Sequence, residues 1–474
     1  MVGSHAAITE ILLRQILLQG SIKLRPSVMQ SIGSGKPFKY PLPETWIKHI
    51  ADNDVKSSFI FSRIFLLLSS LKRTVYGFAK FCILLAQRIN PGNPNCPYVV
   101  FLNLQQSNLP ESNREKSYDI ISWYNKSKIK KSDISKIWVQ ANVKKSYITP
   151  PFLIVSRTIF PRFNHLHSYL QFLFKGILAF MVAIFGILRG KWWYGFLFPE
   201  AVNLHYVHVL KREFLADDYF FHNSNWYYKP LWSYEAEKKG STVSLYYYST
   251  NMENFQYNNH KKKETYGLTI MTWNNFIVWD QQQEEYIKQF CPDAVYTHTS
   301  YVDFSGIGFN SQPNNGVKRL AVFDVTPTRP LKYLQLGFAI PPYYSEELNL
   351  AFFRDVIEIF NNDDWEIYWK KKRVVDKIFV SKAFYKKQLE LVKDKINIVN
   401  PNVAARALVE ISDAVISMPF TSTAILGKIK GIPSVYYDAS SNIQPKKSHD
   451  ISVLRNISEL ANWKKTSWDP VKIK

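Results

Sequence analysis

The chain has 474 residues, 46% of them hydrophobic, which suits two or three folded domains and argues against an intrinsically disordered protein. Its formal net charge of +22 and its 15% aromatic content favour partners that carry phosphate or a negative surface. Three widely separated cysteines, Cys82, Cys96 and Cys291, argue against a disulfide scaffold and a structural zinc site, and they favour a reducing compartment.

The first part of the chain, residues 1–96, is predicted to be a helical, basic extension, for which docking on a membrane and packing as arms on the rest of the protein are the two alternatives. Residues 8–18 have apolar side chains at helical spacing, and Gly20 is placed to end that helix. In residues 59–86, lysine and arginine recur among apolar runs, a pattern typical of helices that lie in a membrane interface. Glu10 within the first apolar stretch, and the lack of a small-residue cleavage site, argue against a secretory signal.

A second apolar segment, residues 169–188, has almost the length of a transmembrane helix, about 20 residues. Lys175 interrupts it, and Trp192, Trp193 and Tyr194 follow it like an interfacial anchor. A full span would place the strand-like residues before and after it on opposite sides of a bilayer. We therefore expect monotopic insertion or a buried core helix before a true span, and a cytoplasmic protein that is peripheral or monotopic at the inner membrane.

Residues 97–315 are predicted to form an α/β domain on the acceptor side. Its expected strands are residues 98–102, 137–140, 217–222, 242–248, 276–279 and 294–297, with helices at 231–239 and 281–290. A sugar transfer that inverts the configuration at the anomeric carbon needs a base to take the proton of the acceptor hydroxyl. His222, at a strand end, is the first candidate and His298 the second, and an ordinary hydrogen-bonding role stays open for both.

Residues 316–474 alternate regularly between strand and helix patterns after a turn-rich linker at 311–316. The expected strands are 320–323, 365–369, 396–399, 414–417 and 433–437, and the expected helices are 346–360, 379–392, 403–411, 423–430 and 451–460. This alternation predicts a doubly wound parallel sheet, whose ligands bind beyond the carboxyl ends of the strands.

Hydroxyl residues open one of these helices directly after a strand. The strand ends at Ser417, and Thr421, Ser422 and Thr423 begin the helix, so its free N–H groups are either capped or available to a donor phosphate. Three cations at the same edge of the sheet are further candidates for the donor phosphates: Arg329, Lys372 and Arg373. Asp438 is a candidate for a ribose or sugar hydroxyl. Surface charge for the cations, and a turn or cap role for Asp438, remain the alternatives.

The segment Pro419-Phe420-Thr421-Ser422, with its flanks 413–417 and 431–438, resembles the bacterial polysaccharide-biosynthesis proteins named for their PFTS motif. The resemblance implies synthesis of a surface polysaccharide and a glycosyltransferase-type fold, and it adds Pro419 and Phe420 to the donor-binding residues. We therefore expect a GT-B-like pair of Rossmann-type domains with an N-terminal helical, membrane-associating extension.

The expected activity is transfer of a sugar from a nucleotide-sugar donor to a lipid-linked or glycan acceptor, at an anionic membrane surface. No cofactor other than this donor substrate and no nucleic acid are expected. No metal is expected either, because the only Asp-x-Asp spacing, Asp52 and Asp54, does not follow a convincing strand. A GT-B-like sugar-nucleotide epimerase and a non-catalytic scaffold of a polysaccharide assembly complex remain the alternatives.

Overall fold

A computed structural model describes most of the chain after residue 59 as two compact units. The first comprises Met1–Tyr248 and Thr265–Tyr301, and the second comprises Ser249–Glu264 and Val302–Lys474. The predicted domain boundaries at residues 96 and 315 lie outside the described residues. The described residues are 60–86, 97–104, 109, 119–130, 136–141, 146–149, 152–155, 158–189, 193–222, 229–247, 273–289, 291–302, 308–309, 316–325, 327, 345–371, 382–401, 403–443 and 449–467.

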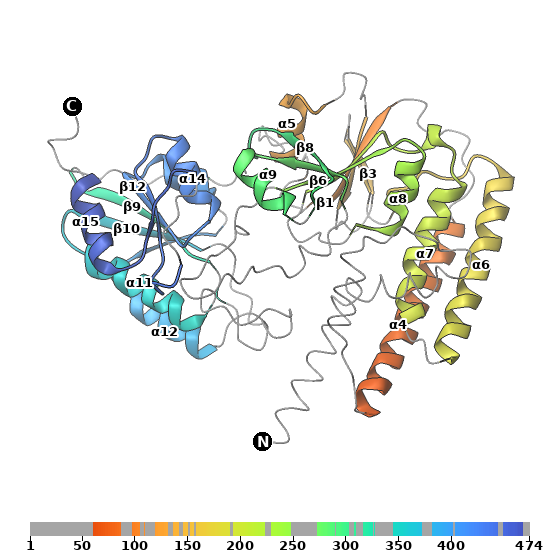
Figure 1. The fold of residues 1–474 in the computed structure, drawn as a ribbon, viewed down its shortest axis with the longest axis horizontal. Coiled ribbons are helices and arrows are strands. Elements are labelled where there is room, and N and C mark those ends of the chain that lie inside the picture. Colours follow the sequence, from red (N-terminus) through yellow and green to blue (C-terminus); the bar gives the residue numbers. More distant parts are fainter. Residues whose placement is uncertain are drawn as a thin grey trace. The chain divides into compact units, whose positions relative to one another are not determined.

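The first unit is built around an eight-stranded sheet in the order β3-β4-β2-β1-β5-β6-β7-β8 (Figure 1). All neighbouring strands are parallel except β3 and β4. Its strands are β1 (Tyr98–Leu104), β2 (Lys136–Ala141), β3 (Tyr147–Thr149), β4 (Phe152–Val155), β5 (Asp218–Phe221), β6 (Thr242–Tyr246), β7 (Asn275–Val278) and β8 (Val295–His298). Three helices, α5 (Asp119–Lys126), α8 (Leu231–Lys238) and α9 (Gln281–Lys288), connect successive strands. The predicted α/β domain is confirmed.

Strand β1 is the centre of this sheet, and its Val99, Val100 and Phe101 are fully buried. From β1 the chain runs outward through β2 and β4, and then returns to the other side of β1 for β5 and the later strands. The direction of the strand order therefore reverses between β1 and β5. This is the position at which open parallel sheets bind their ligands.

Three long helices of the first unit pack against one another: α4 (Ile60–Leu85), α6 (Leu166–Leu188) and α7 (Trp193–Val209). Figure 1 shows the three helices lying side by side. Rings of α4 and α6 meet directly, with centroids 5.0 Å apart for Phe78 and Phe180 and 5.3 Å apart for Phe81 and Phe172. Helix α7 was not predicted from the sequence.

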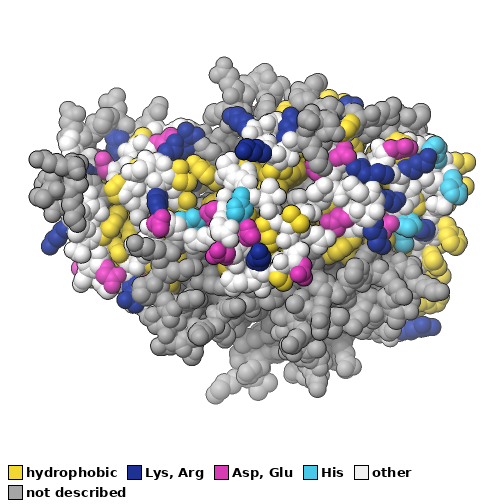
Figure 2. All heavy atoms as spheres, turned by 45° about the horizontal axis from the view of Figure 1, so that its top comes forward, with side chains coloured by type: hydrophobic (Ala, Val, Ile, Leu, Met, Phe, Trp, Pro, Cys, Tyr) yellow, Lys and Arg dark blue, Asp and Glu magenta, His cyan; other side chains and the backbone are white. Residues whose placement is uncertain are grey.

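Helix α6 buries only one face. Its buried residues, Phe172, Gly176, Ala179, Ala183, Gly186 and Ile187, recur at helical spacing. The opposite face is apolar and open, and Figure 2 shows hydrophobic side chains along the right-hand edge of the molecule, where α6 lies. The alternative of a buried core helix is therefore wrong. Tyr194 is itself buried, which contradicts its predicted role as an interfacial anchor.

Helices α4 and α7 approach so closely at Gly195 that a larger side chain does not fit. A Cβ atom at this position would lie 2.5 Å from the backbone oxygen of Ser70. We expect Gly195→Val to lower the free energy of unfolding by about 2–3 kcal/mol, because the two helices must move apart. Urea unfolding measures the loss, with Gly308→Ala as the control, since no atom lies within 4 Å of a Cβ there. An equal midpoint for both variants would contradict this packing.

The second unit holds a six-stranded, all-parallel sheet in the order β11-β10-β9-β12-β13-β14. Its strands are β9 (Lys318–Phe323), β10 (Trp365–Lys370), β11 (Asn397–Val399), β12 (Ala414–Ser417), β13 (Ser434–Tyr437) and β14 (Val453–Leu454). Its helices are α11 (Glu346–Phe360), α12 (Lys382–Val392), α13 (Ala405–Glu410), α14 (Ser422–Ile429) and α15 (Ile457–Ser467). Helix α11 packs beside α12 and α15, and α13 packs beside α14. Counted along the chain, this is the strand order 3-2-1-4-5-6 of a Rossmann fold, which confirms the predicted doubly wound sheet.

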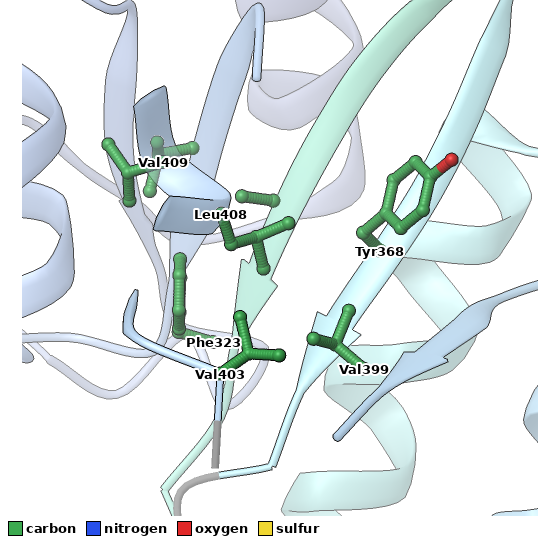
Figure 3. Packing of buried hydrophobic residues seen from close by; sticks show 8 residues of the cluster. Phe323, Tyr368, Val399, Val403, Leu408 and Val409 are labelled. Atoms are coloured by element: carbon green, nitrogen blue, oxygen red, sulfur yellow. The ribbon is translucent and has the colours of Figure 1, made fainter. Parts of the chain in front are cut away.

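One core of the second unit lies between α13 and the strands. Leu408 and Val409 of α13 pack against side chains of β9, β10, β11 and β12 (Figure 3). The eight buried members of this cluster are Ala321, Phe323, Tyr368, Val399, Val403, Leu408, Val409 and Val415. These residues pack α13 against the strands that the candidate loops follow.

The predicted helix at residues 451–460 is wrong. Residues Val453–Leu454 form the edge strand β14, and α15 begins only at Ile457. Asn456 explains the later start, because its side-chain oxygen accepts a hydrogen bond from the Glu459 backbone N–H (2.9 Å). The Glu459 side chain in turn accepts from the Arg455 backbone N–H (2.8 Å), in the manner of a capping box.

Candidate functional site

The strand order of the second sheet reverses between β9 and β12, which are hydrogen-bonded neighbours. Asp324 follows the end of β9, and the segment 418–423 follows the end of β12. Both loops therefore start at the carboxyl edge of the sheet, beside the reversal, where Rossmann-type sheets bind nucleotides. The predicted motif residues thus lie where the topology alone would place a donor.

The motif loop is tied firmly to the strands on either side of it. The Met418 backbone N–H donates to the Phe323 carbonyl (3.0 Å), and the Val325 N–H donates to the Met418 sulfur (3.3 Å). On the other side, the Tyr436 hydroxyl donates to the Thr421 carbonyl (3.3 Å). The loop is therefore fixed to both β9 and β13.

Phe420, at the centre of the motif, has a backbone φ of 60°. This left-handed conformation is unfavourable for a bulky residue and costs of order 1–3 kcal/mol. The Phe420 ring is almost completely buried and packs edge-on against Tyr436, with centroids 5.6 Å apart. Burial of the ring holds the strained turn in place, and the turn aims the following residues into the start of α14. Pro419 and Phe420 therefore shape the loop.

The start of α14 lacks a side-chain cap. Thr421 is the N-cap residue, but its hydroxyl makes no capping hydrogen bond and instead lies 3.2 Å from the Thr423 hydroxyl. The Thr423 hydroxyl also bonds Ser417 (2.9 Å). Since a helix leaves its first N–H groups without intrahelical partners, the first turn of α14 presents donors and a positive dipole end. Of the two interpretations of these hydroxyls, this geometry favours the anion site over capping.

Sequence reasoning missed Asp324, which holds a buried polar network behind this edge of the sheet. Its carboxylate accepts from Trp369 Nε1 (3.0 Å) and from Asn349 Nδ2 (3.0 Å). The Asn349 carbonyl oxygen accepts from Gln388 Nε2 (2.6 Å). These bonds join the loop after β9 to α11, β10 and α12. Asp324 therefore positions the site, and a polar residue directly after a buried strand was the available signal.

Two lysines lie at the carboxyl end of β10, next to β9. Lys371 is only 9% exposed, and its Nζ lies 4.8 Å above the Trp369 ring and 5.0 Å above the Tyr385 ring. Burial lowers the pKa of Lys370, and the negative Asp324 offsets part of that effect. Sequence reasoning chose the next two residues instead. Lys372 and Arg373, like Arg329, lie outside the described residues.

Asp438 is buried at the end of β13, where it organises its own loop. One carboxylate oxygen accepts from the Ser440 backbone N–H (3.0 Å) and the Ser440 hydroxyl (2.6 Å). The other accepts from the Ile443 N–H (2.9 Å). This geometry supports the turn alternative for Asp438, because a donor hydroxyl would have to compete with these three bonds.

His222 follows β5, directly beside the reversal of the first sheet. It is 5% exposed, and burial lowers its pKa to about 4. The imidazole is therefore neutral at physiological pH, which is the form that accepts a proton.

His298 has different surroundings. It ends β8, the edge strand of the same sheet, and is exposed. Its Nε2 bonds the Glu284 carboxylate (2.6 Å), and this bond is the largest cause of the lowered pKa of Glu284. A hydrogen-bonded pair of partly exposed side chains at the edge of the sheet is a common surface feature. The topology therefore favours His222 as the base.

Two buried histidines make the stability of the first unit depend on pH. Burial lowers the pKa of His205 and of His222 to about 4, against about 6.5 in an unfolded chain. Between these values only the unfolded state takes up the protons, so stability should fall as the pH is lowered from about 6.5 towards 4. The expected slope is about 1.4 kcal/mol per pH unit for each histidine.

Urea midpoints between about pH 7.5 and 5 measure this slope, since most carboxylates titrate below that range. His205→Gln should remove about half of it. If this substitution left the slope unchanged, groups other than His205 would be responsible for the dependence of stability on pH.

Metal-ligating side chains do not cluster in the described part of the chain: it contains no group of three or more His, Cys, Asp or Glu that could hold a metal ion. Asp52 and Asp54 lie outside that part. The expectation of a metal-free site remains a prediction.

A family model described as polysaccharide biosynthesis PFTS motif protein matches residues 170–464. No curated protein matches the chain.

Similar solved structures cover most of the chain at low identity. An E. coli trehalose-6-phosphate protein bound with UDP-2-fluoro glucose is 10% identical, with a TM-score of 0.40, over 79% of this chain and 92% of that one. UDP-GlcNAc 2-epimerase from Methanocaldococcus jannaschii is 10% identical, with a TM-score of 0.39, over 79% and 93%. The wall teichoic acid polymerase TagF is 12% identical, with a TM-score of 0.40, over 86% and 90%. No residue role transfers at such identities.

Proposed function

Because the chain belongs to the PFTS-motif family of polysaccharide-biosynthesis proteins, we propose that it is a GT-B-like glycosyltransferase of surface-polysaccharide synthesis. The substrates in this proposal are a nucleotide-sugar donor and a lipid-linked or glycan acceptor. The observation that carries the proposal is the position of the family motif: it opens α14, without a side-chain cap, beside the reversal of a Rossmann-type sheet.

In the proposed reaction, the donor phosphates bind at the start of α14. The N–H groups of its first turn, with the hydroxyls of Ser422 and Thr423, hold the phosphate that leaves. Lys371 adds a sheltered positive charge two strands away, roughly 10 Å from β12 along the sheet. These groups stabilise the negative charge that develops as the bond between the sugar and the phosphate breaks.

The acceptor hydroxyl forms the new bond to the anomeric carbon. Its proton passes to a base, for which we propose His222, because this side chain directly follows β5 at the ligand edge of the first sheet, beside the reversal of the strand order. The products are the glycosylated acceptor and a nucleoside phosphate. We propose that no metal takes part, so that EDTA should leave the rate unchanged.

A thermal-shift screen of the purified protein against nucleotides and nucleotide-sugars tests the donor site first. A donor at 100 times its Kd should add about 2.7 kcal/mol to the free energy of unfolding. Ser422→Ala, which keeps the helix start but removes one hydroxyl, should reduce the shift. The absence of any shift in a folded sample would favour the scaffold alternative.

Product analysis then distinguishes the transferase from the epimerase. A transferase releases a nucleoside phosphate only as acceptor is consumed, whereas an epimerase converts the donor alone into an isomer. Isomerised donor without release of nucleoside phosphate would replace the transferase proposal by the epimerase.

A further inference from the structure

Helices α4 and α6 expose an unusual number of apolar side chains. On α4 the exposed large apolar residues are Leu67, Leu68, Leu71, Val75, Tyr76, Phe78 and Ile83, and on α6 they are Leu166, Leu170, Phe174, Ile177, Leu178, Met181, Phe185 and Leu188. The two helices are neighbours through the ring contact of Phe78 with Phe180. We call this surface the α4–α6 face. Soluble monomers rarely expose a continuous apolar area this long, and such areas mark interaction sites.

Charge identifies the occupant of this face. Neither α4 nor α6 contains an aspartate or a glutamate; basic residues recur along α4, and α6 contains Lys175. Lys72 and Arg73 of α4 are exposed, and so is Arg189 directly after α6. Apolar side chains beside basic ones suit the boundary between acyl chains and anionic lipid headgroups. A second copy of the chain would bring like charges together, so a dimer through this face is disfavoured.

The topology argues against a membrane span. Helix α6 has 23 residues, or roughly 34 Å, and is, by length and composition, the one candidate span in the described part of the chain. However, β4 precedes α6 and β5 follows α7, and both strands belong to one sheet. The chain must therefore return to the side from which it left. The returning helix α7 is buried, and it packs against α8 of the α/β unit as well as against α4 and α6.

We propose that the α4–α6 face inserts into one leaflet of an anionic bilayer and holds the protein there as a monotopic membrane protein. The apolar rows enter the acyl boundary, and Lys72, Arg73 and Arg189 contact lipid phosphates. Insertion of one face requires no rearrangement, because the other faces of these helices already pack on α7 and on each other. The proposal does not depend on the donor site.

Flotation of the full chain with lipid vesicles tests this proposal. The wild-type chain should float with vesicles that contain phosphatidylglycerol, and float less with phosphatidylcholine alone or at raised salt. The double variant Phe174→Asp, Phe185→Asp should bind the vesicles at least roughly tenfold more weakly than the wild type. The reason is that two exposed rings proposed to enter the bilayer are replaced by carboxylates. The control is Ile398→Asp, which also replaces an exposed apolar side chain by aspartate, in the edge strand β11 of the other unit.

Circular dichroism must show that each variant is folded, which we expect since all three side chains are exposed. Flotation of the double variant equal to that of the wild type would overturn the proposal. So would a wild-type chain that stays out of the vesicle fraction at low salt. Dimerisation without lipid that the double variant abolishes would identify a second copy as the occupant, and would overturn it as well. Equal flotation with neutral vesicles contradicts the part assigned to the basic residues.

Discussion

Ser422→Asp is expected to abolish donor binding while leaving the protein as stable as the wild type, or slightly more stable. The residue is the first of α14, where a carboxylate interacts favourably with the helix dipole and typically adds about 0.3–1 kcal/mol. The same carboxylate occupies the N–H groups proposed for the donor phosphate and repels that phosphate. Turnover should therefore fall by two orders of magnitude or more.

This substitution separates two interpretations that Ser422→Ala cannot separate. If the hydroxyl residues only start the helix, an aspartate replaces them without loss of donor binding. Thermal unfolding without ligand measures the effect on the helix, and isothermal titration with the nucleotide-sugar measures the effect on the site. A stable variant that binds the donor as the wild type does would falsify the donor site at α14. Asp413 is exposed at the opposite end of β12, and Asp413→Asn serves as a control for a charge change away from the proposed site, which should leave donor binding intact.

Local sequence patterns were sufficient to predict the helices that bury only one face. Helix α11 was predicted with its observed bounds, because its apolar residues recur at helical spacing. Its start is also local, since the Ser345 hydroxyl accepts from the Leu348 N–H (3.1 Å). Helix α7 has no such pattern: its apolar and aromatic residues are not confined to one face, and α4, α6 and α8 all pack against it. A helix buried on every side loses the periodicity on which sequence reasoning depends.

In the candidate site, too, some residues could be predicted from the local sequence and others could not. The segment 418–423 could be found because its signal is local: a strand end followed directly by hydroxyl residues. The role of Asp324 could not, because Asn349 and Trp369 bond it from elements 25 or more residues away in the chain, and Gln388 bonds Asn349 from a third element. The strained turn at Phe420 was also hidden, since nothing in one sequence shows that an aromatic residue adopts a positive φ.

His222→Gln is expected to lower turnover by two to four orders of magnitude and to leave donor binding intact. Glutamine keeps hydrogen-bonding groups in the buried position but cannot accept the acceptor proton. The donor-induced thermal shift should persist, because the donor site is proposed in the other unit. His298→Gln is the matched control, and it should cost little, since that side chain is exposed and paired with Glu284 at the edge of the sheet.

The pH profile of turnover distinguishes a buried base from a solvent-exposed base more sharply than the substitutions do. Burial lowers the pKa of His222 to about 4, so this base stays able to accept a proton from about pH 8 down to pH 5. The rate should accordingly show no acid limb in that range, provided that the sample remains folded. An acid limb near pH 6.5, the usual value for an accessible imidazole, would contradict the assignment and indicate a solvent-exposed base. A flat profile in this range and a large loss of turnover in His222→Gln are both required to assign His222 as the base.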